Sequence, residues 1–264
     1  FRQEVFKERE PLPRYAYDGM DAAETDERPP VTRDIAPAPP VNGAYRRWLF
    51  TNVMGQKQPG FSVVAIRLRL GDISSPQMRS LAQLLRRYCG GRLRTSIEQN
   101  LLLRWVRNEH LTALFAELQP LGLAEPEAGK LYDVTSCPGA ETCQLGISAS
   151  RGLARAVETR FKSAGLSGPD LDDIRIKVSG CPNSCGQHHV ADIGFFGGAR
   201  KLNDHLAPHF QLMVGGFTEE GTAQFGAPVV RLPARRIPDA LVHMLERYRQ
   251  DRQSPRESFR TFSG

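Results

Sequence analysis

Two stretches decide the fold: CPGAETC at residues 137–143 and GCPNSCGQ at residues 180–187. Each stretch holds two cysteines, which are separated by five residues in the first and by three in the second. An iron–sulfur cubane needs four thiolates, and two loops can supply two each. Pro and Gly beside the cysteines favour tight loops whose backbone N–H groups can point at cluster sulfurs and tune the reduction potential. The pattern favours a metal or cluster site over a disulfide framework.

The cysteines also allow three alternative roles. Structural zinc is the strongest of these, because His188 and His189 lie shortly after Cys185 and would allow a mixed Cys/His site. The cysteine intervals are nevertheless wider than the two-residue spacing common at zinc. Two disulfides would suit a secreted chain, and four inert buried thiols are a further possibility. The fifth cysteine, Cys89, stands alone near the end of an expected helix and is interpreted as a core residue.

The composition sets broad limits on function. The chain has 264 residues, of which 40% are hydrophobic, and this is enough for one large core or two small ones. No apolar stretch approaches the ~18–20 residues of a membrane span, and neither a membrane nor nucleic acid is an expected partner. The net charge of +6 favours a polycarboxylate cofactor, an oxyanion or an acidic redox protein, unless it serves solubility alone.

Compartment and chain ends are also open to prediction. Paired thiols at a metal site indicate a reducing compartment, so we expect the cytoplasm. The sequence opens at Phe1 with neither an initiator Met nor a signal peptide. We therefore expect a cut N-terminus, with targeting information lost along with it.

The chain is predicted to be an α+β protein with two structured units. A ferredoxin-like half-domain is expected at 46–125, and a mixed α/β domain that contains the cysteine stretches at 126–250. Residues 1–45, rich in Pro and charge, predict an extended linking or wrapping segment. Residues 251–264 predict a frayed polar tail.

Hydrophobic periodicity predicts the elements of the half-domain. Alternation over 61–70 predicts a half-buried strand with Arg67 and Arg69 on its polar face. Ser74-Ser75-Pro76 predicts a helix start, and Gly90-Gly91 predicts its end. A strand at 101–106 and a helix at 111–118 complete the unit.

The second unit mixes helices and short strands around the cysteines. We expect strands at 174–179, at 190–196 and at 210–214, the second closed by Gly197-Gly198 and the third by Gly215-Gly216. Helices are expected at 152–164 and 238–247.

Several motifs in the sequence resemble those of a known family. The two cysteine stretches are similar to those of the sirohaem and [4Fe–4S] nitrite and sulfite reductases, and the likeness continues through ADIGF at 191–195 and QLMVGG at 211–216. TSIEQN at 95–100 resembles the second of two repeated strand motifs in that family.

The resemblance implies a reaction and a cofactor pair. In these enzymes two related halves enclose a sirohaem coupled to a [4Fe–4S] cluster, and nitrite or sulfite takes up six electrons there. The cluster ligands carry over to Cys137, Cys143, Cys181 and Cys185, with Cys185 also bridging to the sirohaem iron. A reduced ferredoxin or similar low-potential donor is the expected partner, and nitrite is favoured over sulfite.

The chain also departs from the family pattern. The first-repeat strand motif carries an Arg where this sequence has Glu98, and no second strand–helix unit is found. We therefore expect the cluster-bearing C-terminal half, with most of the anion pocket supplied by an N-terminal half. Whether this chain alone is active stays open, and a non-catalytic [4Fe–4S] electron-transfer module or a zinc-stabilised binding protein are the alternatives.

Sirohaem carries eight carboxylates, so its site needs guanidinium, ammonium and amide donors. Solvated surface charge is the competing interpretation for the basic residues. Asn183, between two cysteines, could donate to a cluster sulfide or cap the following turn. The candidate cofactor-binding residues are Arg67, Arg69, Arg94, Gln99, Asn100, Asn183, Arg200 and Lys201.

Overall fold

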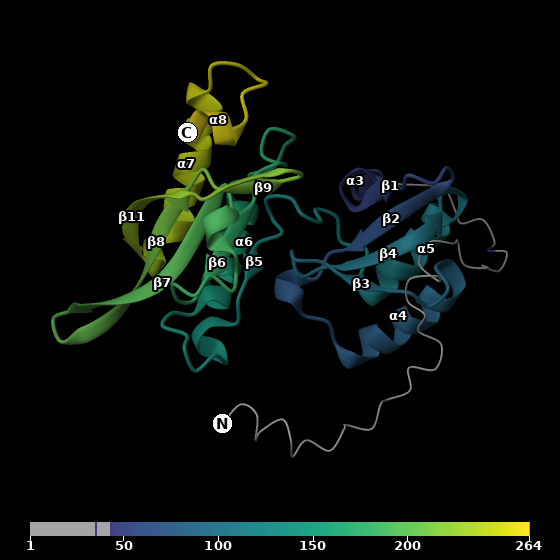
Figure 1. The fold of residues 1–264 in the computed structure, drawn as a ribbon, viewed down its shortest axis with the longest axis horizontal. Coiled ribbons are helices and arrows are strands. Elements are labelled where there is room, and N and C mark those ends of the chain that lie inside the picture. Colours follow the sequence, from purple (N-terminus) through teal and green to yellow (C-terminus); the bar gives the residue numbers. More distant parts are fainter. Residues whose placement is uncertain (1–34, 36–42, 264) are drawn as a thin grey trace, which may run out of the picture.

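The computed structural model describes residue 35 and residues 43–263, which form two units side by side (Figure 1). The extended segment predicted over 1–45 lies almost wholly outside the described residues. No helix among the described residues is long and apolar enough to cross a membrane.

The first unit packs helices against a small antiparallel sheet whose strand order is β1-β2-β4-β3. Its core includes the fully buried side chains of Trp48, Tyr88 and Leu103. The helix that starts after Ser74 begins as predicted, because Ser74 and Gln77 form a reciprocal capping box. The elements are α3 (Gly43–Asn52), β1 (Val53–Gly55), β2 (Phe61–Ile66), η1 (Arg69–Gly71), α4 (Ser75–Tyr88), β3 (Arg94–Thr95), β4 (Leu101–Arg107), η2 (Asn108–His110), α5 (Leu111–Leu118) and η3 (Gln119–Leu121).

The second unit contains a five-stranded sheet in the order β11-β8-β7-β6-β5. Strands β5, β6 and β7 run parallel, whereas β8 and β11 are antiparallel to their neighbours. Helices α6 and α7 share a core with residues of β6, β7 and β8. The elements are β5 (Thr135–Ser136), η4 (Gly139–Glu141), α6 (Ser150–Ala164), β6 (Ile176–Ser179), η5 (His188–Val190), β7 (Ile193–Leu202), β8 (His205–Val214), β9 (Phe217–Glu219), β10 (Thr222–Gln224), β11 (Ala227–Pro233), η6 (Ala234–Arg236), α7 (Ile237–Asp251) and α8 (Phe259–Ser263).

The strand predicted over 61–70 is shorter than expected. β2 ends at Ile66, and Leu70 has φ +57° inside the short helix η1. Arg67 and Arg69 both lie beyond the end of β2, and Arg69 begins η1, so they do not share a strand face.

Two predictions about the second unit are wrong. Strand β7 continues through Gly197 and Gly198 to residue 202 in place of ending there. The C-terminal tail, predicted to be frayed, instead folds back onto α7. Its Phe259 is buried and packs edge-on against Tyr248, with ring centroids 5.4 Å apart. The Tyr248 hydroxyl donates to the Glu257 carbonyl (2.6 Å), which fixes the same segment.

Candidate iron–sulfur centre

The two cysteine stretches lie against each other. The backbone N–H groups of Ile147 and Ser148 donate to the Gly180 carbonyl at 3.1 and 2.9 Å. In return, the Gly180 N–H donates to Cys137 Sγ at 3.1 Å. The Ser150 hydroxyl donates to the Cys137 carbonyl (2.7 Å), and its oxygen lies 3.4 Å from Cys137 Sγ. The loop that carries one pair of cysteines therefore already supplies an N–H···S bond to the other pair.

Glycines allow this close approach. A Cβ built on Gly180 would lie 2.7 Å from Gly139 Cα, and one built on Gly146 would lie 2.5 Å from the Gly139 carbonyl carbon. Gly197 of β7 packs on the same spot, where its Cβ would meet the Gly180 carbonyl oxygen at 2.5 Å. Glycine is therefore required at this position by close packing within β7, which continues past it while paired with β8. Side chains at these positions would push the cysteine loops apart.

The donor set fits a [4Fe–4S] cluster. Cys137 and Cys181 are buried, while Cys143 and Cys185 are exposed. The described residues contain no group of three or more His, Cys, Asp or Glu side chains that could hold one metal ion. The thiolates of a cubane bind four separate irons, so they need not meet at one point. Four thiols on two loops in contact, with a backbone N–H directed at one sulfur, match the needs of such a cluster.

Side chains brace the second cysteine stretch from within. The Ser179 hydroxyl accepts from the Gly186 N–H (3.1 Å) and lies 2.8 Å from His188 Nδ1. Lys177 donates to the Gln187 side-chain oxygen at 2.7 Å. Burial lowers the pKa of His188 to about 4, so this imidazole is neutral at pH 7. His189 Nδ1 lies 2.9 Å from the Ser184 hydroxyl. Both histidines that suggested a mixed zinc site are therefore within hydrogen-bonding distance of serine hydroxyls.

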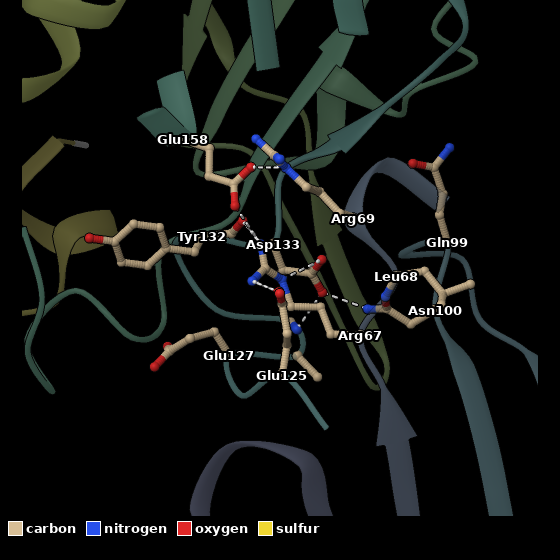
Figure 2. Close-up of polar contacts among 12 residues, drawn as sticks. Arg67, Leu68, Arg69, Gln99, Asn100, Glu125, Glu127, Tyr132, Asp133 and Glu158 are labelled. Carbon is tan, nitrogen blue, oxygen red and sulfur yellow. Dashed lines mark hydrogen bonds and ion pairs between the residues drawn. The ribbon is translucent and has the colours of Figure 1, made fainter. Parts of the chain in front are cut away.

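A buried ionic network joins the two units (Figure 2). Arg67 donates to the Tyr132 carbonyl at 2.5 Å and lies 3.4 Å from Glu158 and 3.5 Å from Asp133. Burial alone would raise the Glu158 pKa, but Lys162, Arg69 and Arg67 lower it on balance. For Asp133 burial dominates and raises the pKa, despite donors that favour the carboxylate.

Three of the predicted cofactor ligands have protein partners at the junction between the units, and their cofactor roles stay predictions. The Arg67 side chain is only 5% exposed and pairs with the carboxylates of Asp133 and Glu158. Gln99 bonds the backbone of Ser136, donating to its carbonyl (2.9 Å) and accepting from its N–H (3.1 Å). Asn100 is buried and donates to Asp133. Their polar atoms serve the junction between the units, which a single strand motif cannot reveal.

The next predicted cofactor ligands are more exposed than Arg67, Gln99 and Asn100. Arg69 bonds Glu158 through Nε (2.5 Å) with about half its side chain exposed, and Arg94 is exposed on β3. Asn183 is exposed. Lys201 pairs with Asp204 at 2.8 Å within the β7–β8 hairpin. The cofactor roles of Arg69, Arg94 and Asn183 stay predictions.

Arg200 lines a basic cavity beside the cysteine loops. The cavity, of about 600 Å³, is bordered by Pro182 of the second cysteine stretch, by Ile147 shortly after the first, and by Arg200, His209 and Arg231 of the sheet. Among the described residues that line it, none is Asp or Glu. Sequence reasoning missed Arg231, because β11 is mostly exposed and has no burial alternation to mark it.

These features define a redox domain built on paired cysteine loops, and comparison with known proteins gives its family. Residues 54–121 match the nitrite/sulfite reductase ferredoxin-like half domain, and residues 127–261 match the nitrite and sulphite reductase 4Fe-4S domain. The chain belongs to the nitrite and sulfite reductase family. The predicted family, α+β class and [4Fe–4S] and sirohaem cofactors are confirmed, and the zinc interpretation is set aside.

Individual relatives support the same assignment. A chloroplastic ferredoxin–nitrite reductase of Zea mays is 35% identical over 209 residues, and one of Oryza sativa is 30% identical over 248. The NirA protein of Mycobacterium tuberculosis superposes with a TM-score of 0.66 at 25% identity, over 80% of this chain and 39% of that one. Dissimilatory sulfite reductase I superposes over 76% of this chain and 66% of its own, with a TM-score of 0.62 at 11% identity, a likeness of fold alone.

The alignments leave much of these relatives unmatched. They cover 75% and 90% of this chain but only 36% of the maize protein and 41% of the rice protein. The chain therefore spans about two fifths of the length of these curated relatives.

Proposed function

We propose that this chain forms the cluster-bearing half of a ferredoxin-dependent nitrite reductase. The reaction adds six electrons and eight protons to nitrite and yields ammonium and two waters. The observation that best supports this proposal is the contact between the two cysteine stretches, in which the Gly180 N–H donates to Cys137 Sγ (3.1 Å). Cys137, Cys143, Cys181 and Cys185 would hold the cluster, which when bound would supply single-electron transfer to a sirohaem.

The chain's own residues hold and shield this site. Hydrogen bonds from backbone N–H groups to cluster sulfur stabilise the more negative, reduced state and so raise the reduction potential. The buried sulfur of Cys137 receives such a bond, and burial of Cys137 and Cys181 keeps water from that side of the cluster. The braces around Ser179 and Gln187 fix the loop that carries Cys185.

The relatives indicate a substrate and an electron donor. Ferredoxin–nitrite reductases at 30–35% identity support nitrite and a ferredoxin. The anion-binding basic residues are proposed to come from a first half, since Glu98 stands where the first-repeat motif has Arg and the relatives extend well beyond the matched region. A net charge of +6 suits an acidic donor.

Turnover tests the substrate assignment. The anaerobically purified protein that carries this chain, supplied with reduced ferredoxin, should convert nitrite to ammonium with a kcat/KM at least tenfold above that for sulfite conversion to sulfide. Increasing salt should slow the reaction with ferredoxin, because exposed charges are screened. Faster sulfite turnover would reassign the substrate. Cluster absorption without sirohaem bands or turnover would favour an electron-transfer module.

We further propose that Arg200 binds a carboxylate of the sirohaem. Its support is the acid-free cavity beside the cysteine loops, where Arg231 provides a second guanidinium. Arg200→Gln should reduce the sirohaem bound per cluster several-fold, measured by the ratio of haem absorbance to acid-labile sulfide. Lys201→Gln is the matched control, because Lys201 pairs with Asp204 and does not line the cavity. Equal sirohaem content in the two variants would rule out this role for Arg200.

A further inference from the structure

A hairpin turn of the ferredoxin-like unit contacts β5, the strand that leads into the first cysteine stretch. The turn links β3 to β4 and is closed by the Ser96 N–H, which donates to the Asn100 carbonyl at 2.9 Å. The Ser96 hydroxyl accepts from the N–H groups of Glu98 (3.2 Å) and Asn100 (3.3 Å). Gln99 adopts φ +66°, a left-handed conformation that is uncommon for a residue other than glycine. The turn thus holds Gln99 in a specific backbone conformation.

The Gln99 amide takes the place of a neighbouring strand. β5 is an edge strand, with β6 on one side only. On the other side, Gln99 Nε2 donates to the Ser136 carbonyl (2.9 Å) and Gln99 Oε1 accepts from the Ser136 N–H (3.1 Å). Ser136 is 1% exposed, so water cannot replace these bonds. This side chain therefore satisfies both backbone groups of the residue that immediately precedes Cys137.

The neighbouring Asn100 fixes the approach to the same strand. Asn100 Nδ2 donates to Asp133 at 2.5 Å, and Asn100 Oδ1 accepts from the Leu68 N–H at 2.8 Å. Asp133 also accepts from the Gly129 N–H at 2.7 Å. Figure 2 shows Gln99 and Asn100 beside this network, next to each other on one turn. The buried Asn100 anchors the junction, and Gln99 contacts the residue that precedes Cys137.

The residue after Ser136, Cys137, is also held by backbone hydrogen bonds. Directly after Ser136, the Cys137 N–H donates to the Val178 carbonyl (3.1 Å), and Cys137 Sγ accepts from the Gly180 N–H (3.1 Å). Gln99 thus holds one side of a strand whose other side aligns Cys137 with its N–H donor. Gly71 leaves room for this arrangement, since its Cβ would lie 3.1 Å from Gln99 Cβ.

We propose that Gln99 is a positioning residue for the thiolate of Cys137, and through the Gly180 N–H···S bond it sets the reduction potential of the cluster. The inference rests on the proposed function, in which Cys137 is a cluster ligand. Gln99 touches neither cluster nor substrate in this role. If its support is lost, β5 shifts, the N–H···S bond lengthens and the potential falls.

Gln99→Met tests this role, because methionine keeps the side-chain length and removes both hydrogen bonds. The control is Ile97→Ser, a change at an exposed position of the same turn. In the anaerobically purified holoprotein, Gln99→Met should lower the midpoint potential of the cluster and speed iron release to a chelator several-fold. Ile97→Ser should change neither. A merely structural role would lower the unfolding temperature and leave the potential of the intact holoprotein unchanged.

The outcomes separate the two proposals. A wild-type protein without iron and sulfide would overturn the proposed function and this inference together. A wild-type cluster whose potential and iron release are the same in Gln99→Met would overturn the inference alone. If Gln99→Met fails to fold, Gln99→Asn applies the same test, since it keeps the amide but is one methylene too short to reach Ser136.

Discussion

At the scale of single residues, the absence of side chains shapes the cysteine site as much as their presence. Gly180 donates its N–H to Cys137 Sγ while its Cα lies directly over the first cysteine loop. Its φ does not lie in the left-handed region, so glycine is needed here for space and not for backbone conformation. The role of this residue can therefore be tested with one methyl group.

Gly180→Ala should separate the two cysteine loops. The new Cβ would lie 2.7 Å from both Gly139 Cα and the Ser148 carbonyl oxygen, which are backbone atoms that cannot rotate away. Overpacking of this kind typically costs about 1–3 kcal/mol. We expect a lower unfolding temperature and a loss of most bound iron, measured by thermal denaturation and iron analysis.

Gly198→Ala is the control for that change. Gly198 is on the neighbouring strand, and nothing lies within 4 Å of its Cβ position. Its content of acid-labile sulfide, and of the iron that belongs to the cluster, should equal that of the wild type. Equal iron content in the two alanine variants would show that close packing of the loops is not required.

At the scale of elements, β5 shows how the two units depend on each other. It is a two-residue strand, too short to be stable alone, yet it leads into the first cluster cysteine. β6 pairs with one edge, and Gln99 of the other unit pairs with the opposite edge. The Arg67 network holds the same junction, and removal of one partner from a buried ion group of this kind typically costs about 3–5 kcal/mol.

The sequence predicts some elements well and others poorly, for physical reasons. The capping box at Ser74 is a local signal, and α4 begins where it predicts. Strand β2 ends early because its pairing with β4 stops at Ile66, and the chain then turns into η1, a change that alternation alone does not encode. Gly197 is typical of a strand end, but here it serves a contact with the distant Gly180 and β7 continues past it.

The same distinction applies to the candidate site. The cysteine spacing is local and specific, so it indicates the cluster without a structure. Arg67 and Arg69 carry positive charge in a pattern that is typical of a cofactor surface, but both meet Glu158, 91 and 89 residues further along the chain. Contacts at that sequence separation are a property of the fold, and a single sequence does not reveal them.

At the scale of the whole molecule, the two units form one support for the paired cysteine loops. The half-domain contributes the turn that carries Gln99 and Asn100, and the larger unit contributes the cysteines and the acid-free cavity. The matched domains of the family meet at this junction, between residues 121 and 127. The central claim is that four thiols on two touching loops hold a [4Fe–4S] cluster.

The most direct test is iron and acid-labile sulfide analysis of the anaerobically purified protein, with Cys181→Ser compared with Cys89→Ser. Cys89 is a buried cysteine of the other unit, and burial raises its pKa to about 12, so it stays a neutral thiol. We predict four irons and four sulfides in the cluster of the wild type and of Cys89→Ser, and a large loss of both in Cys181→Ser. An unchanged cluster in Cys181→Ser, or zinc in place of iron, would contradict the central claim.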